Sequence, residues 1–400
     1  MLKKFKLFDS DSLKLLHRRV FFSITLFIFV YSISVYRISS IMLFPEMIDE
    51  TFKVSKANIR GDIYDRNGKI LATSVMSTSI SLNPNKIKNK KNLSVKLANI
   101  LNLDQVKLEK KLNSNKKFIW IKRNITPSEY QKIINLGEIN IKSHNELKRI
   151  YPYKNVSSHV VGYVNIDQKG QTGIERYFED KLKIEKNIFI SLDINLQQLV
   201  RESLMQTIDF YRADSGLAVV MEIESGQILS SVSLPDFNPE NYFSFDENNL
   251  INRVFQSNFE MGSTFKPITA TMGFDMGLIN PNMTFDVTKK YLNISDHDKY
   301  KEDGIYDVEK VIVESSNIGT AQIASIIGKN NQKKFFKKIG FNNRINIENK
   351  ESANPLGNKN NWGPKETATI GFGHGFSITP LHLVKAYATL SDQGFEVEPT

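Results

Sequence analysis

The chain has 400 residues, a hydrophobic fraction of 40% and a formal net charge of +10, which predicts two or three domains with sizeable cores. The absence of cysteine excludes disulfides and thiolate metal sites. Lysine and asparagine are mixed with isoleucine throughout, and no basic patch with interleaved aromatic residues stands out, so we expect no nucleic acid partner.

The first structural feature is an apolar run near the N-terminus. Residues 20–36 carry no charge, and beyond Arg37 the apolar sequence resumes as far as Phe44. A bilayer core requires about 20 apolar residues, so this stretch spans it if Arg37 extends its charge to the interface. We therefore expect a transmembrane anchor over residues 20–44.

A short basic tail, residues 1–19, precedes this anchor. By the positive-inside rule the tail stays in the cytoplasm and the rest of the chain is exported. Two alternatives compete with an anchor, namely a buried helix of a soluble domain and a cleaved signal peptide. The run is long for a signal peptide and no A-x-A-like site follows it, which favours a single uncleaved anchor.

The next segment favours mixed α and β structure. Residues 60–73 read as two strands around an Asn67-Gly68 turn. Residues 84–123 are typical of lysine-rich helices; for example, apolar residues spaced three and four apart predict a helix over residues 93–112. Residues 159–164 are rich in valine and tyrosine and are typical of a short strand.

Capping residues place two further helix starts. Thr126 is followed three residues later by Glu129, which predicts a capping box. Asp193 is placed to cap a helix over residues 194–210, and a hairpin over residues 215–233 follows it. A helix followed by an antiparallel hairpin predicts an α+β fold class.

The candidate nucleophile is Ser263, which has a lysine three residues on. Pro267 is tolerated only in the first turn of a helix, so a helix begins at or just before Ser263, and Lys266 lies on the same face. The helix N-terminus adds free N–H groups and partial positive charge, and Gly262 leaves space for a substrate. A buried lysine has a lowered pKa and, once neutral, can take the proton of the serine hydroxyl.

A second motif, Ser315-Ser316-Asn317, completes the candidate site. Ser315 is suited to relay a proton to a leaving amine. Asn317 is suited to donate to a substrate carbonyl and to hold the lysine in place, and we assign Ser316 to substrate binding. Alone, these residues are typical of a turn or a helix cap; the presence of the serine–lysine pair favours a catalytic role.

These motifs resemble those of the class B penicillin-binding proteins, in which Ser-x-x-Lys and Ser-x-Asn precede a Lys-Thr/Ser-Gly motif. The resemblance covers nearly all of the part that we expect to be exported. Residues 60–68 look like a family motif of the non-catalytic domain, and residues 170–175 and 236–239 match other landmarks. Residues 315–317 and 371–380 look like the cell-division (FtsI) type.

The resemblance implies an α+β protein with an elongated pedestal, or dimerisation, domain over residues 45–190 and a serine β-lactamase-like transpeptidase domain over residues 191–400. It implies a penicillin-binding D,D-transpeptidase that cross-links peptidoglycan stem peptides of the septal wall through an acyl-enzyme on Ser263, without metal or cofactor. It also implies a single-pass inner-membrane protein with a cytoplasmic N-terminus and a periplasmic catalytic domain. The implied partners are an FtsW-like glycan polymerase and small bitopic division proteins.

One family motif is missing from the sequence. No Lys-Thr/Ser-Gly tripeptide follows Asn317, and Lys338-Ile339-Gly340 lacks the hydroxyl and reads as a helix end. Because the first two motifs are intact, we interpret the transpeptidase domain as incomplete at its C-terminus. Two other functions stay open: an inactive membrane-anchored divisome scaffold, and a hydrolase of β-lactams or D-Ala-D-Ala peptides.

Overall fold

The computed structural model describes residues 10–43, 59–296, 304–357 and 362–400. The chain divides into two compact units, which are residues Met1–Ala57 and Asn58–Thr400.

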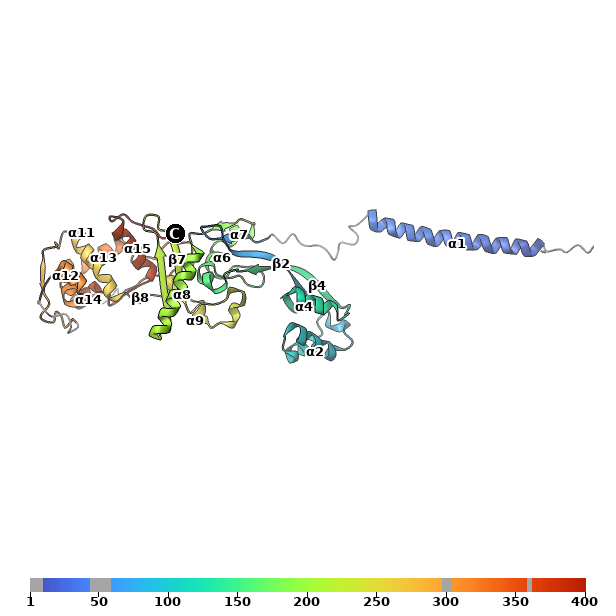
Figure 1. Ribbon diagram of the computed structural model, residues 1–400, viewed down its shortest axis with the longest axis horizontal. Helices are drawn as coiled ribbons and strands as arrows, with labels where there is room; N and C mark the ends of the chain where they lie inside the picture. The colour runs from blue at the N-terminus through green and yellow to red at the C-terminus, as the bar shows by residue number, and fades with distance from the viewer. Residues whose placement is uncertain (1–9, 44–58, 297–303, 358–361) are drawn as a thin grey trace, which may run out of the picture. The chain divides into compact units, whose positions relative to one another are not determined.

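The first unit contains the helix α1 (Ser10–Leu43), drawn in blue in Figure 1. Of the described residues, only the stretch His17–Ser39 of this helix is long and apolar enough to cross a membrane, and none of it is buried. The predicted anchor falls on this helix, except for Phe44, which lies outside the described residues.

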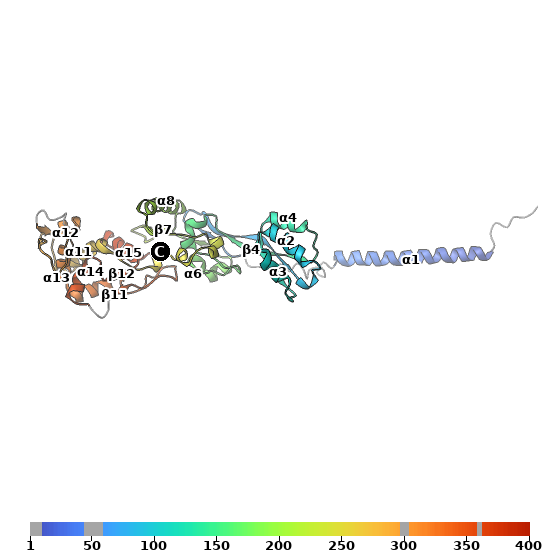
Figure 2. The same ribbon diagram turned by 90° about the horizontal axis from the view of Figure 1, so that it is seen from below.

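In the second unit, residues 59–192 are organised around a five-stranded sheet (Figures 1 and 2). The strands pair in the order β3-β2-β1-β5, and β4 pairs with β2 off this path. The long β2–β4 ladder is antiparallel, running from Thr73↔Ile150 to Leu82↔Ile141. The strands are β1 (Ile63–Tyr64), β2 (Ile70–Leu82), β3 (Ile119–Ile125), β4 (Ile141–Ile150) and β5 (Ile188–Phe189).

Three helices lie at one end of the β2–β4 ladder (Figure 2) and enclose a small core with it. Leu93, Leu97 and Leu101 recur at the spacing of one helix face and are all buried there. These three helices are α2 (Lys90–Leu101), α3 (Gln105–Leu112) and α4 (Pro127–Ile134). Three short helices lie at the other end of the ladder, namely α5 (Ser158–Val161), α6 (Gly173–Tyr177) and α7 (Glu179–Lys183).

Several expected elements are confirmed. The β1–β2 hairpin forms, with Gly68 at φ 79° in its turn. The capping box of α4 is complete, since Thr126 accepts from the Glu129 amide and the Glu129 carboxylate accepts from the Thr126 amide. Asp193 caps α8 (Ile194–Tyr211), and the later hairpin joins β6 (Gly216–Met221) to β7 (Ile228–Leu234). The α+β class is therefore confirmed.

Two predicted elements are wrong. The helix predicted over residues 93–112 is interrupted, because Asn102 takes a left-handed conformation that ends α2 and Asp104 caps α3. Residues 159–164 are not a strand: residues up to Val161 belong to α5. The buried ring of His159 meets the Asn249 carbonyl at 2.8 Å, so tertiary packing overrides the β propensity of the valines.

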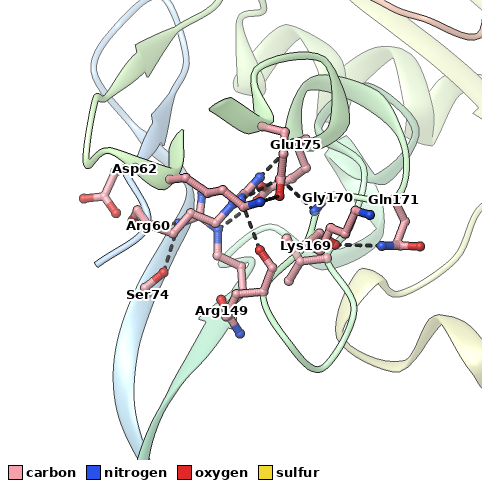
Figure 3. Close-up of polar contacts among 12 residues, drawn as sticks. Arg60, Asp62, Ser74, Arg149, Lys169, Gly170, Gln171 and Glu175 are labelled. Carbon is pink, nitrogen blue, oxygen red and sulfur yellow. Dashed lines mark hydrogen bonds and ion pairs between the residues drawn. The ribbon is translucent and has the colours of Figure 1, made fainter. Parts of the chain in front are cut away.

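Two arginines and one glutamate form a buried charge cluster beside β2 and β4 (Figure 3). We call Arg60, Arg149 and Glu175 the pedestal clamp. Arg60 Nε donates to Glu175 Oε2 at 2.6 Å and Arg149 Nε donates to Glu175 Oε1 at 2.8 Å. Their side chains are 3%, 1% and 0% exposed. Arg149 also donates to the Ser74 hydroxyl, so the clamp ties α6 to the strand β2.

The rest of the second unit contains the predicted site. The β6–β7 hairpin packs against α8, and three-stranded and two-stranded sheets lie farther along the chain. Its remaining strands are β8 (Phe259–Glu260), β9 (Thr284–Asp286), β10 (Ile305–Asp307), β11 (Leu356–Gly357) and β12 (Phe376–Ile378). Its remaining helices are α9 (Glu247–Leu250), α10 (Arg253–Gln256), α11 (Lys266–Asp275), α12 (Val308–Val313), α13 (Asn317–Lys338), α14 (Pro364–Gly371) and α15 (Pro380–Ser391).

The apolar core of this region is built around α11 and α13. Phe265, Phe336 and Phe341 are almost completely buried in it, with ring centroids 5.7–5.9 Å apart. Phe265 belongs to the turn that carries Ser263. The core therefore anchors the nucleophile turn through the buried Phe265, while Ser263 in the same turn stays exposed.

Candidate active site

Ser263 lies in a 3₁₀ turn, Gly262–Phe265, directly before α11. The expected helix start is thus refined: the turn holds the serine and the α-helix begins at Lys266. Gly262 has φ 56°, a conformation that favours glycine. A Cβ on Gly262 would meet no atom within 4 Å, so this side of the turn is open. Substrate binding at Gly262 stays a prediction.

Lys266 is the most unusual charged side chain of the site, because it is only 1% exposed. Its Nζ donates to the Ser315 hydroxyl at 2.9 Å and also to the Ser315 carbonyl. Burial lowers the pKa of Lys266 from 10.5 to about 8, although the charge of Asp296 opposes this shift. A substantial fraction of the amine is therefore neutral near physiological pH and can accept a proton.

Ser315 occupies the tight connection between α12 and α13. It has φ 51°, which is uncommon for a residue with a side chain. This conformation accompanies the contact of both its hydroxyl and its carbonyl with the Lys266 amine. The structure therefore brings together Lys266 and Ser315, which are far apart in the sequence. Ser263 lies three residues from the lysine, and within the described part of the chain no hydrogen bond joins its hydroxyl to the Lys266 amine.

Ser316 has a structural position. Its hydroxyl accepts from the Gly319 amide at 2.9 Å as the N-cap of α13 and donates to Asp296 Oδ2 at 2.6 Å. It is 2% exposed. With its hydroxyl engaged in this way and hidden from solvent, Ser316 is not available to a substrate, which argues against the predicted binding role. The helix-cap interpretation applies to this residue of the motif.

Asn317 is the first residue of α13 and is half-buried. Its backbone N–H donates to Asp296 Oδ1 at 2.5 Å, and its side-chain Nδ2 donates to the Ser295 carbonyl at 3.4 Å. The expected contact between Asn317 and Lys266 is not formed within the described residues. A contact between Asn317 and a substrate carbonyl stays a prediction.

Asp296 is the residue of this site that sequence reasoning missed. Its carboxylate accepts from the Ser316 hydroxyl and from the amides of Asn317 and Ile318. It therefore fixes the start of α13, where the helix dipole favours a negative charge. No spacing rule marks Asp296, because it lies in a loop 20 residues before Ser316 and only the fold brings the two together.

Replacing Asp296 with alanine is expected to lower the free energy of unfolding by about 1–3 kcal/mol, because buried donors at the start of α13 lose their acceptor. Asp286→Ala is a suitable control, since Asp286 is exposed and, among the described residues, its side chain hydrogen-bonds to nearby Thr288 alone; we expect a loss below about 0.5 kcal/mol. Denaturant unfolding measures both. Equal losses would show that Asp296 does not anchor the helix.

The loop at residues 371–375 packs against the nucleophile turn. The Gly262 amide donates to the Gly373 carbonyl at 3.3 Å, and Thr269 Oγ1 donates to the Gly371 carbonyl at 2.6 Å. A Cβ on Gly373 would approach the Gly262 carbonyl oxygen to 2.3 Å. Only glycine allows this close approach at position 373.

These contacts define what the site can do. An exposed hydroxyl at the start of a helix is flanked by a buried lysine that is partly neutral and by a second serine bonded to that lysine. Nucleophilic attack by a serine requires a base near its hydroxyl, and free N–H groups at a helix start can stabilise a developing oxyanion. The arrangement therefore suits acyl transfer through a serine ester.

Two family models match the chain. Residues 55–192 match the penicillin-binding protein dimerisation domain, and residues 216–400 match the penicillin-binding protein transpeptidase domain.

The chain is also similar to curated proteins that are named as peptidoglycan D,D-transpeptidases. A probable peptidoglycan D,D-transpeptidase FtsI of Caulobacter vibrioides is 28% identical, covering 85% of this chain and 59% of the relative. A probable peptidoglycan D,D-transpeptidase PenA of Neisseria meningitidis is 29% identical over 84% of this chain and 63% of the relative. The peptidoglycan D,D-transpeptidase FtsI of Buchnera aphidicola is 30% identical over 85% and 66%. The chain thus spans about three fifths of the length of the first two.

The dimerisation model ends where α8 begins, and the transpeptidase model includes Ser263, Lys266 and Ser315. Both models and the relatives agree with the motifs and with the geometry around Lys266. The chain belongs to the class B penicillin-binding proteins of the FtsI type.

Proposed function

We propose that this chain is a peptidoglycan D,D-transpeptidase that cross-links stem peptides of the septal cell wall and is acylated by penicillin. The observation that carries the proposal is the buried Lys266 amine, hydrogen-bonded to Ser315 and with its pKa lowered to about 8, one helical turn from the exposed Ser263. The similarity to proteins named as probable peptidoglycan D,D-transpeptidases supports the same reaction.

In the first half-reaction, neutral Lys266 takes the proton of the Ser263 hydroxyl, and the oxygen attacks the carbonyl carbon between the two terminal D-alanines. The backbone N–H of Ser263 is one donor for the resulting oxyanion. The C–N bond then breaks, and the leaving D-alanine amine receives a proton from Lys266 through the Ser315 hydroxyl. Ser263 is left as an ester of the donor peptide.

In the second half-reaction, the amine of a neighbouring stem peptide attacks this ester. Its surplus proton passes to the Ser263 oxygen as the C–O bond breaks, which restores the hydroxyl and forms the new amide. Dividing one difficult step into two easier steps is the gain of covalent catalysis. Asn317 and Gly262 are the proposed contacts of the donor peptide.

We further infer a division into a pedestal over residues 45–190 and a transpeptidase domain over residues 191–400. The limits of the two family models support it. The proposed location is the inner membrane, crossed once by α1, with residues 1–19 in the cytoplasm and the catalytic domain in the periplasm; the basic tail supports this orientation. The proposed partners are an FtsW-like glycan polymerase and small bitopic division proteins.

Intact-mass spectrometry of the detergent-solubilised chain after benzylpenicillin treatment tests the activity, with Ser263→Ala as the control. We expect a stable adduct of one penicillin on the wild type and none on the variant. An adduct that forms and disappears quickly would instead identify a hydrolase. The lack of any adduct on a folded wild-type chain would mean either that acylation requires the missing Lys-Thr/Ser-Gly motif or that the domain is an inactive scaffold; repeating the assay on a chain extended past Thr400 would distinguish these two.

A further inference from the structure

Tyr387 reaches the nucleophile turn from a separate helix. It lies on α15, a helix capped by Thr379 and packed against α10, α11 and β6. Its hydroxyl donates to the Thr264 carbonyl at 2.8 Å. Thr264 directly follows Ser263, so this hydrogen bond joins α15 to the turn that carries the nucleophile.

The backbone of the turn depends on such external contacts because it is not regular α-helix. The Ser263 carbonyl accepts from the Lys266 amide within the 3₁₀ turn, and the Gly262 amide donates to the loop at Gly373. The Thr264 carbonyl points instead to Tyr387. This carbonyl belongs to the peptide group between Thr264 and Phe265, so its hydrogen bond restrains how far the turn that carries Ser263 can shift. Catalytic geometry is sensitive to displacements of about 1 Å.

We propose that Tyr387 is a positioning residue, whose hydroxyl holds the Thr264 carbonyl and thereby fixes the orientation of Ser263. This inference rests on the proposed function only for its catalytic consequence; the restraint on the turn is independent of it. Burial raises the pKa of Tyr387 above its usual value, so the phenol stays protonated and remains a donor at neutral and moderately alkaline pH.

The phenol is suited to this role by its rigidity. The side chain is 36% exposed, but it has only two torsions to order, so its hydroxyl is held with little loss of entropy on bonding. Tyr387→Phe removes only the oxygen and leaves the ring packing in place. Tyr211→Phe is the matched control, because Tyr211 is exposed at the end of α8 and the same atom is lost there.

Two measurements test the proposal on the full chain. In hydrogen–deuterium exchange, we expect peptides covering residues 262–266 to exchange about 3- to 10-fold faster in Tyr387→Phe than in the wild type, as one hydrogen bond is lost. In penicillin acylation, we expect the first-order acylation constant to fall by a similar factor, with the dissociation constant of the non-covalent complex unchanged. Tyr211→Phe should match the wild type in both.

The outcomes separate this inference from the proposed function. Unchanged exchange of the turn in Tyr387→Phe would overturn the inference, whether or not the chain is acylated. A general rise in exchange with a lowered melting temperature would also overturn it, since the phenol would then support only the fold. Faster exchange confined to the turn in a chain that penicillin never acylates would uphold the restraint and refute the proposed function.

Discussion

Replacing Lys266 with methionine is expected to reduce the rate of Ser263 acylation by about 10³-fold or more, since general-base assistance contributes about 10²–10⁴-fold and the residues of such a site act together. Methionine has a similar length and suits a buried position, so the fold is retained. The rate of penicillin adduct formation measures the effect. Lys107→Met, at an exposed position on α3, serves as the control and should leave the rate unchanged.

The same lysine predicts how acylation depends on pH. The amine must be neutral to accept the serine proton, and burial places its pKa at about 8. The acylation rate of the wild type should therefore rise with pH and level off above about 8. A profile that is flat between pH 6 and 9 would show that Lys266 is not the base.

The lowered pKa of Lys266 should also make the free energy of unfolding depend on pH. The pKa of Lys266 is about 8 in the folded chain and 10.5 when exposed, so the unfolded chain binds the extra proton between these values. The unfolding free energy contributed by this group is lowest below pH 8 and rises as the pH increases toward 10.5. We expect the stability of the wild type relative to Lys266→Met to increase over this window by an amount on the order of 2 kcal/mol.

Glu175→Gln is expected to destabilise the protein by about 3–5 kcal/mol, because the buried Arg149 loses its carboxylate partner and Arg60 keeps only its ion pair with Glu179. Arg60 and Arg149 both bond to this one side chain, and none of the three is more than 3% exposed (Figure 3). Glutamine keeps the shape but not the charge. Denaturant unfolding measures the loss, which is a large part of the stability of a typical domain.

An exposed ion pair provides the comparison. Lys338 and Asp275 lie 3.1 Å apart, with side chains 66% and 45% exposed, and Asp275→Asn should cost less than about 1 kcal/mol. If Glu175→Gln proves too unstable to purify, Glu175→Gln combined with Arg149→Met should recover part of the loss by removing one unpaired charge. A cost for Glu175→Gln no greater than that of Asp275→Asn would show that the clamp is not a source of stability.

Secondary structure was predictable where local rules act. The capping box at Thr126 and the cap at Asp193 formed as expected, since a cap depends on residues within one turn. The error at residues 93–112 was avoidable, because Asn102 and Asp104 carry the stop and start signals of two helices. The error at residues 159–164 was not, because the contact of His159 with Asn249 joins distant segments.

The pedestal motifs show the same division. Arg60 and Glu175 belong to two sequence motifs that resemble family motifs. The sequence alone does not show why one motif contains an arginine and the other a glutamate. The structure supplies it, since the two side chains meet in a dry interior with Arg149 as the third member. An ion pair between segments more than one hundred residues apart produces no local sequence pattern from which it could be predicted.

The candidate nucleophile and base could be predicted from the sequence alone, because Ser263 and Lys266 belong to one turn and Pro267 marks where that turn begins a helix. The family and the apolar helix near the N-terminus were predictable as well, since they follow from motifs and composition. The contact of Ser315 with the lysine, the burial of Ser316 as a cap, and the hydrogen bonds of Asp296 and Tyr387 to the two motif segments could not be predicted in this way. The physical reason is that burial and long-range hydrogen bonds, which set the pKa of Lys266 and orient its partners, depend on segments that only folding brings together.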